Sequence, residues 1–554
     1  MQPIAGHGNI KLADLLLDYG ANVNASNFSG WTPMDSAAYN CHWDMVRWLV
    51  NNGAVVNKKH RFGLLVLSNA AYYREWDIVK LLVYHGADIN QIDEDKTILQ
   101  DAYMQDNLEM IKWLAKHGAD VNVQDDDGCT PSHRAAESGD FELVWWLVKL
   151  GADVNVKNKS GRTILHSAAE SGNLKLVKWL VKQGADVKAK DNSGNTVLHA
   201  AAEISNLKLV KWLVKQGVDV NVQDDDGCTP SHRAASNGNL ELVKWLIEYG
   251  AEVKTLDNTG RTLLHCVASN GNLELVKWLI EQGLDVNTKS NDGQTVSQIA
   301  VQNGYQGLVK WLVEHGAELN AKDQNAQTVL LYAAKNKQWE MVQWLIKQGA
   351  DVNAKDVHGQ TALLYATNDM QWELVKWLIE HGADINSEQN SGTTVLHYAA
   401  MHYKWELVKW LVKHGADVNI QNSYGCTVLL YVIDTYKIDS ELVKWLIEHG
   451  ADVNVKDKSD ETVLLYVADK KQWELVQWLV EHGADVNAKE NGGKTILHLA
   501  AEDSALEVIQ WLAERGANIY AKDNYGHSVL YCARHSEFPV PELIQWLKDQ
   551  GVRE

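Results

Sequence analysis

A glycine recurs about every 33 residues along the whole chain, just after an amphipathic segment that in fifteen of seventeen cases has Trp-Leu near its end. The spacing is 33 residues, except for one step of 32 and two of 35. A period of this length is typical of repeat proteins, in which one supersecondary unit cannot bury its apolar face alone. The chain must therefore fold as an array of stacked units. The seventeen glycines are Gly20, Gly53, Gly86, Gly118, Gly151, Gly184, Gly217, Gly250, Gly283, Gly316, Gly349, Gly382, Gly415, Gly450, Gly483, Gly516 and Gly551.

The clearest unit runs over residues 161–187 and predicts two short helices. Thr163 precedes an apolar run over residues 164–169, where a threonine can cap the first helix. Residues 174–182 place apolar side chains at i, i+1, i+4 and i+5, with lysines on the opposite face, which predicts a second, amphipathic helix. Gly184 can adopt the left-handed conformation that ends it.

Three motifs of this unit resemble ankyrin repeats: Gly-x-Thr-x-Leu-His-x-Ala-Ala, Gly-Asn-Leu-Glu/Lys-Leu-Val and Gly-Ala-Asp-Val-Asn. The resemblance covers essentially the whole chain, about sixteen times over. It implies an all-α solenoid of stacked helix-turn-helix units with short β-hairpin fingers, whose concave face binds other proteins. It further implies a non-enzymatic protein-binding scaffold that needs no cofactor.

The repeats divide one continuous solenoid into four zones by residue type. Residues 1–90 are divergent and aromatic, residues 91–320 keep the family pattern, and residues 487–554 form two closing units. In residues 321–486 several repeats replace the family's His by Leu and follow it with Tyr. Within the second zone the sixteen residues 121–136 recur without change 99 positions later, which indicates the duplication of a three-repeat block.

Composition restricts the class of partner. The formal charge of −20, without a compensating run of Lys and Arg, argues against nucleic acid and favours a basic segment on a protein partner. The six cysteines are scattered without a CxxC pair, which indicates a reducing compartment rather than a disulfide framework or a zinc site. No secretory leader and no run of 18 apolar residues is present, so we expect a monomeric cytoplasmic protein with no membrane insertion.

The recurring tryptophans, histidines and aspartates could be read as ligand-binding or metal-binding residues, but the sequence does not favour that interpretation. Fifteen tryptophans stand five residues before a turn glycine, and we expect them to cover the joint between successive second helices rather than to bind a flat ligand. The recurring histidines have no second ligand at metal-binding spacing, and the Asp-Asp-Asp-Gly runs lack the pattern of a calcium loop. No nucleophile elbow, phosphate loop or His-Glu-x-x-His helix occurs.

The two residues after Ala-Ala in each first helix look into the concave groove of the family and are not dictated by packing. Near the N-terminus these positions and the neighbouring fingers gather aromatic, basic and methionine side chains, which are typical of interface anchors. The alternative is that the aromatic residues only seal an imperfect end of the array. The predicted protein-binding residues are Trp31, Tyr39, His60, Arg61, Phe62, Tyr72, Tyr73 and Met104, with a smaller candidate at Met401, His402 and Tyr403.

Two further hypotheses come from the resemblance. Long, recently duplicated arrays are similar to those of intracellular bacteria, symbionts and large DNA viruses, where they act on host proteins. The chain would then be a host-directed effector in the host cytoplasm, or the targeting part of a larger toxin whose catalytic domain lies outside these residues. The loop asparagines, such as Asn90, Asn122, Asn155, Asn353 and Asn419, resemble those that hydroxylases modify in the family.

Overall fold

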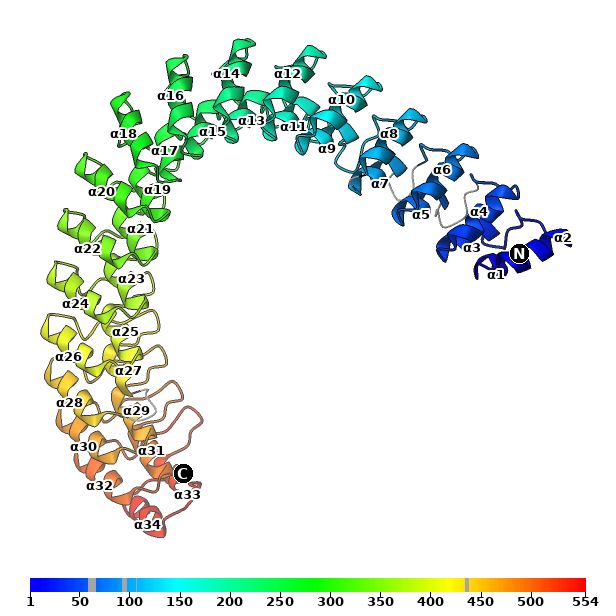
Figure 1. Ribbon diagram of the computed structural model, residues 1–554. Helices are drawn as coiled ribbons and strands as arrows, with labels where there is room; N and C mark the ends of the chain where they lie inside the picture. The colour runs from blue at the N-terminus through cyan, green and yellow to red at the C-terminus, as the bar shows by residue number, and fades with distance from the viewer. Residues whose placement is uncertain (58–65, 92–96, 106, 434–437) are drawn as a thin grey trace. The chain divides into compact units, whose positions relative to one another are not determined.

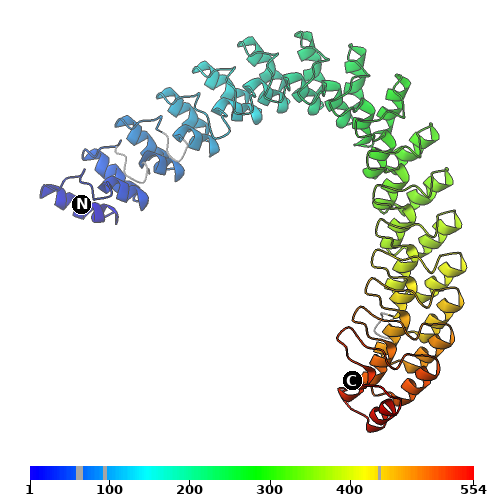
Figure 2. The same ribbon diagram turned by 180° about the vertical axis from the view of Figure 1, so that it is seen from behind.

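A computed structural model describes residues 1–57, 66–91, 97–105, 107–433 and 438–554. The chain divides into two compact units, Met1–Asn291 and Asp292–Glu554. In each unit the helices alternate between two rows, one of first helices and one of second helices (Figures 1 and 2). Among the described residues the chain forms 34 helices, so the predicted all-α repeat solenoid is confirmed.

The first helices of the repeats are short and mostly seven residues long. In the first unit they are α1 (Gln2–Ala5), α3 (Pro33–Tyr39), α5 (Val66–Tyr72), α7 (Ile98–Met104), α9 (Pro131–Glu137), α11 (Ile164–Glu170), α13 (Val197–Glu203), α15 (Pro230–Ser236) and α17 (Leu263–Ala268). In the second unit they are α19 (Val296–Gln302), α21 (Val329–Lys335), α23 (Ala362–Asn368), α25 (Val395–Met401), α27 (Val428–Ile433), α29 (Val463–Asp469), α31 (Ile496–Glu502) and α33 (Val529–Arg534).

The second helices are nine residues long throughout. In the first unit they are α2 (Ile10–Asp18), α4 (Trp43–Asn51), α6 (Trp76–Tyr84), α8 (Leu108–Lys116), α10 (Phe141–Lys149), α12 (Leu174–Lys182), α14 (Leu207–Lys215), α16 (Leu240–Glu248) and α18 (Leu273–Glu281). In the second unit they are α20 (Gln306–Glu314), α22 (Trp339–Lys347), α24 (Trp372–Glu380), α26 (Trp405–Lys413), α28 (Ser440–Glu448), α30 (Trp473–Glu481), α32 (Leu506–Glu514) and α34 (Pro541–Asp549).

The repeat that contains α11 and α12 illustrates how the sequence sets each boundary. The Thr163 backbone N–H donates to Nδ1 of His166 at 3.2 Å, which closes the capping box at the start of α11. The side chain of Asn173 accepts from the Leu176 N–H at 3.1 Å and caps α12. After α12 the chain enters the left-handed region at Gly184, where φ is +98°, a conformation that glycine adopts without a Cβ penalty.

The core of a repeat lies between its two helices and those of its neighbours. Ile164, Leu165, Leu176 and Leu180 are fully buried, as the pattern predicts, whereas Val181 is only half-buried. Helix α11 packs against both α9 and α13, so each first helix fills the faces of two neighbours. Burying a leucine side chain contributes about 2 kcal/mol, and most of this gain requires the adjacent repeat.

The loop between one repeat's second helix and the next repeat's first helix forms a projecting finger. The fingers are closed by turns, as in residues 158–162, where the Asn158 N–H donates to the Arg162 carbonyl at 2.9 Å. In the part of the chain that the structure describes, the β-structure of these fingers is limited to single bridges in five of them, such as Lys157 with Thr163. The expected β-hairpins are therefore present in a minimal form, and the division of the sequence into four zones stays a prediction.

None of the described helices combines the length and the hydrophobicity that crossing a lipid bilayer requires. The side of each unit that is built from the first helices and the fingers is called the inner face below.

Candidate functional site

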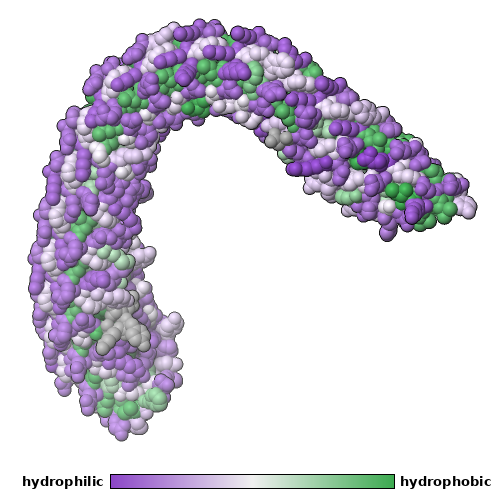
Figure 3. Space-filling view, viewed as in Figure 1, coloured by the Kyte–Doolittle hydropathy of each residue, from purple (hydrophilic) through white to green (hydrophobic). Residues whose placement is uncertain are grey.

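Large exposed side chains stand on the inner face of three consecutive N-terminal repeats. Tyr39, Tyr72 and Met104 are the last residues of α3, α5 and α7, and they are 59%, 71% and 65% exposed. Tyr73, next to Tyr72, is 48% exposed. In the space-filling view most of the visible surface is hydrophilic, with small hydrophobic areas that include several over these repeats (Figure 3). Exposed apolar side chains grouped in this way are characteristic of interaction surfaces.

The structure brings four of the predicted residues into two aromatic pairs. The ring of Trp31 meets that of Tyr39 edge to face with centroids 5.3 Å apart, and Tyr72 meets Tyr73 in the same geometry at 5.2 Å. Tyr73 also lies 6.0 Å from Trp43, the first residue of α4, which the sequence analysis did not include in the site. We call Trp31, Tyr39, Tyr72 and Tyr73 the N-terminal aromatic patch.

Tyr73 is held by a second contact besides the aromatic rings. Its pKa is raised, chiefly by a hydrogen bond with the side chain of Cys41, an exposed residue of the preceding repeat. Since the ordinary tyrosine pKa of 10.0 already lies well above neutral pH and that of Tyr73 is higher still, Tyr73 offers a hydroxyl group to a partner.

The remaining predicted residues fall elsewhere. Met104 lies beside a separate pocket that is described below, and His60, Arg61 and Phe62 lie outside the described residues. In the second unit Met401 and Tyr403 are 37% and 63% exposed.

Two tryptophans support this second group. His402 lies 6.1 Å from the Trp372 ring, and Tyr403 meets Trp405 edge to face at 5.7 Å. We call Met401, His402 and Tyr403 the second patch.

A contact between the first helix and the finger of the same repeat was missed in the sequence. In three repeats a tyrosine hydroxyl donates to the carboxylate nine residues earlier: Tyr332 to Asp323 at 2.7 Å, Tyr365 to Asp356 at 3.0 Å and Tyr466 to Asp457 at 3.0 Å. Arginines take the same position in the duplicated block, where Arg134 bonds Asp125 and Arg233 bonds Asp224. The recurring i, i+9 spacing of these pairs was the available signal.

The recurring histidines serve as structural joints between repeats. His166, for example, accepts from Thr163 through Nδ1, and its Nε2 lies 3.3 Å from the Asn195 carbonyl in the next finger. Burial lowers the pKa of His166, so the ring is neutral at neutral pH. No group of three or more His, Cys, Asp or Glu side chains converges as a metal site among the residues that the structure describes.

Each tryptophan of the recurring register is half-buried on the second helices. The Trp377 ring stacks on His381, four residues later, at 3.7 Å, and Lys347 of the preceding repeat lies over it at 5.9 Å. The same stack with histidine recurs at Trp113, Trp311, Trp410, Trp445 and Trp478. Side chains of the same repeat cover the faces of these rings, and at Trp377 the preceding repeat contributes as well. This geometry fits the expectation that the tryptophans cover the joints between successive second helices.

The loop asparagines join successive repeats. In Asn155 the side-chain amide donates to the Gly184 carbonyl at 3.0 Å, and its oxygen accepts from the Asp186 N–H at 2.9 Å. The side chains of Asn90, Asn122, Asn353 and Asn419 also donate to the turn glycine of the next repeat. These contacts give the asparagines a structural role, whether or not they are modified.

Comparison with known proteins identifies the family. A family profile described as ankyrin repeats in three copies matches seven overlapping segments, residues 67–158, 133–224, 165–257, 231–323, 298–389, 371–457 and 434–523. A second profile, described as ankyrin repeats in many copies, matches residues 4–50.

Two curated relatives share a short stretch with the chain. The Notch-regulated ankyrin repeat-containing proteins of Xenopus tropicalis and Xenopus laevis are each 40% identical to it over 43 residues. This stretch is 8% of the chain and only 38% of each relative's length. Since the family profiles match almost the entire length between residues 4 and 523, the chain belongs to the ankyrin-repeat family.

Proposed function

We propose that the chain is a non-catalytic scaffold that binds a partner protein on its inner face, with the N-terminal aromatic patch as the leading anchor. The observation that carries this proposal is the exposure of Tyr39, Tyr72, Tyr73 and Met104 on consecutive repeats. Tyrosine and tryptophan are enriched among the residues that dominate binding energy, because they bury a large area at low entropic cost. A family of protein-binding repeats supplies the scaffold.

The charge of the chain supports a choice of partner. With 72 acidic and 52 basic residues, its field attracts basic segments and raises their rate of association. We therefore propose a partner that presents a basic segment, bound by a monomeric scaffold in a reducing compartment such as the cytoplasm. All six cysteines are free thiols, which fits that compartment.

The proposal is tested by affinity capture from cell extracts. The wild-type chain is compared with the triple variant Tyr39→Ala/Tyr72→Ala/Tyr73→Ala, and retained proteins are identified by mass spectrometry. The matched control is Tyr19→Ala/Tyr84→Ala/Tyr249→Ala, three exposed tyrosines at the ends of second helices.

The proposal is supported if one protein meets three conditions. The wild type and the control both retain it, moderate salt releases it, and the triple variant, although folded, does not retain it. Equal retention by all three chains means that the aromatic residues only seal the end of the array. A role in targeting an enzyme that lies outside these residues would use the same binding step.

A further inference from the structure

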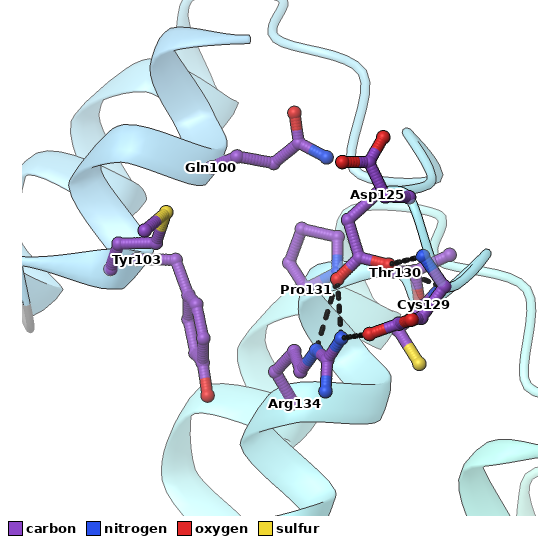
Figure 4. A pocket seen from close by; sticks show the side chains of 10 residues that line it. Gln100, Tyr103, Asp125, Cys129, Thr130, Pro131 and Arg134 are labelled. Atoms are coloured by element: carbon purple, nitrogen blue, oxygen red, sulfur yellow. Dashed lines mark hydrogen bonds and ion pairs between the residues drawn. The ribbon is translucent and has the colours of Figure 1, made fainter. Parts of the chain in front are cut away.

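A pocket of about 310 Å³ opens on the inner face of the first unit, one repeat beyond the N-terminal aromatic patch. It lies between α7 and the finger that precedes α9 (Figure 4). Helix α7 contributes Gln100, Tyr103 and Met104, while Arg134 comes from α9. The finger contributes the three consecutive aspartates 125–127, with Cys129 and Thr130 after them, and Pro131 is the first residue of α9.

The pocket contains a buried hydrogen-bond donor without a partner. Gln100 is only 7% exposed, and its oxygen accepts from the Thr97 N–H at 2.7 Å. Its Nε2 has no hydrogen-bond partner among the residues that the structure describes, although an unsatisfied buried donor costs free energy. In Figure 4 the side chain of Gln100 extends toward the finger.

In six other repeats the same position ties its repeat to the next finger, whereas His232 Nε2, like Gln100 Nε2, has no hydrogen-bond partner among the described residues. In these six repeats the ring or amide nitrogen lies within hydrogen-bonding distance of the carbonyl oxygen 29 residues later, as with Gln298 and Gln327 at 2.8 Å. The other five residues are His133, His166, His199, His397 and His498. The equivalent acceptor for Gln100 is the Cys129 carbonyl, and that bond is absent. The joint between α7 and the finger is therefore left open at this repeat.

The duplicated block supplies an internal comparison. The finger over residues 125–129 has an identical copy 99 residues later, but His199 stands in the place of Gln100. His199 Nε2 lies 3.0 Å from the Cys228 carbonyl, and the side chain of Asp224 is only 1% exposed. The matching side chain of Asp125 is 26% exposed. The same finger sequence is thus packed against the preceding repeat at residues 224–228 and accessible at residues 125–129.

The rim of the open pocket carries excess negative charge. Arg134 forms ion pairs with Asp125 at 2.8 Å, Asp127 at 2.7 Å and Glu137 at 3.3 Å, so one guanidinium faces three carboxylates. Asp126, which is exposed, pairs with no cation among the described residues. The rim can therefore accept a further cation.

The opposite wall is apolar. Met104 is 65% exposed and lines the pocket with Tyr103 of the same helix. Burial raises the pKa of the Cys129 thiol, which is therefore uncharged. Lysine and arginine side chains match such a surface, because their alkyl stems pack on apolar groups while the charged end reaches an acidic rim.

We propose that this pocket binds a basic peptide segment: an arginine or lysine side chain lies along Met104 with its charge at Asp126, and a main-chain carbonyl of the peptide accepts from Gln100 Nε2. This inference rests on the proposed protein-binding function and specifies the chemistry of the partner segment. In this arrangement one ligand supplies both a hydrogen-bond acceptor for Gln100 Nε2 and a positive charge for Asp126.

The test uses the full chain labelled with ¹³C at its eight methionine methyl groups. The Met104 signal is assigned with Met104→Leu, and Met370, which is 50% exposed in the second unit, reports non-specific binding. The probe is a capped pentapeptide of glycine, arginine, leucine, arginine and glycine. The control peptide carries uncharged citrulline in place of arginine.

We expect the arginine peptide to shift the Met104 signal in a saturable way. The affinity of the citrulline peptide should be at least about tenfold lower, since the two peptides differ only in charge. Asp126→Asn should weaken binding about fivefold, whereas Asp225→Asn, the same change in the duplicate finger, should leave it unchanged. Gln100→His installs the residue of the closed repeat and should abolish the shift. A midpoint of urea unfolding at or above that of the wild type shows that this variant is folded.

Equal shifts with both peptides, or equal effects of Asp126→Asn and Asp225→Asn, would overturn the pocket assignment. The proposed function would still hold if the triple tyrosine variant fails to retain the protein that the wild type retains. Conversely, a specific response at Met104 combined with unchanged capture would retain the pocket and reject the aromatic patch as the anchor.

Discussion

The hydroxyl group of Tyr332 donates to Oδ2 of Asp323 at 2.7 Å and so fixes α21 to the finger of its own repeat. Burial and this hydrogen bond raise the pKa of Tyr332 to about 12. The same hydroxyl accepts from the side-chain amide of Gln294, in the finger of the preceding repeat, at 3.1 Å. The Leu-Tyr repeats thus replace a histidine that joins neighbouring repeats by a tyrosine that also braces the finger of its own repeat.

Tyr332→Phe should lower the free energy of unfolding by about 1–2 kcal/mol, because the variant loses a hydrogen bond to a charged acceptor on a half-buried side chain. The change is read from the midpoint of urea unfolding. The contribution should be present below pH 10 and disappear as the pH approaches 12, since the folded pKa lies above the ordinary value of 10.0. An equal loss in Tyr249→Phe, an exposed tyrosine on the second-helix side, would argue against the brace.

The buried histidines predict acid sensitivity. Burial lowers the pKa of His166 below its ordinary value of 6.5, so the unfolded chain binds this proton more readily than the folded one. Stability should therefore be complete above pH 6.5 and fall as the pH drops toward the folded pKa. His133, His199, His232, His397 and His498 share this direction.

His166→Gln isolates one of these histidines, because glutamine already serves at the same position in Gln298. The variant should fold normally and lose less stability than the wild type between pH 7.5 and pH 5, measured by urea unfolding at both values. Identical pH dependence in the two chains would place the acid sensitivity elsewhere.

Asn155→Ala should cost about 1 kcal/mol, because two hydrogen bonds to the next repeat are lost from an exposed loop. Amide exchange at Asp186 should accelerate, since its N–H donates to the Asn155 oxygen. Lys188 occupies the corresponding position one repeat later, and Lys188→Ala is the matched control. Unchanged exchange at Asp186 would show that the amide is protected by another contact.

Tyr403 and Met370 both have positive φ, 54° and 55°, at the turn between two paired helices. Glycine adopts this conformation without the Cβ penalty, so Met370→Gly should stabilise the fold by about 1 kcal/mol in thermal unfolding. Tyr403→Gly should stabilise it by less, because the variant also loses the edge-to-face contact with Trp405. If the second patch binds a partner, only Tyr403→Gly weakens its retention. Equal retention by both variants would remove Tyr403 from the binding surface.

The sequence predicted the parts of the fold that repeat in every unit. Thr163, Leu176 and Gly184 stand in local patterns whose cap, buried face and left-handed turn need only neighbouring residues. The exposure of Tyr39 and Tyr72 followed from their place after a buried alanine pair.

The side-chain contacts that form the finger brace and the pocket were not predicted, although the tryptophan contacts between second helices were. The bond from Tyr332 to Asp323 depends on the path of the finger, which the helix pattern does not specify. The pocket at Gln100 depends on how two adjacent repeats meet, although the presence of Gln100 where the aligned repeat has His199 was visible in the sequence. Binding of a protein by the N-terminal aromatic patch and by the second patch stays a prediction that the experiments above test.

The identical fingers over residues 125–129 and 224–228 have a consequence for how such a chain acquires new specificity. The side chain of Asp125 is 26% exposed and that of Asp224 only 1%, and the preceding repeat presents Gln100 to the first finger and His199 to the second. Copying or deleting a repeat therefore changes which neighbour a finger meets at the new junction, even when no residue of the finger is altered. Under the proposed function, shuffling whole units would itself be a means of varying what is bound.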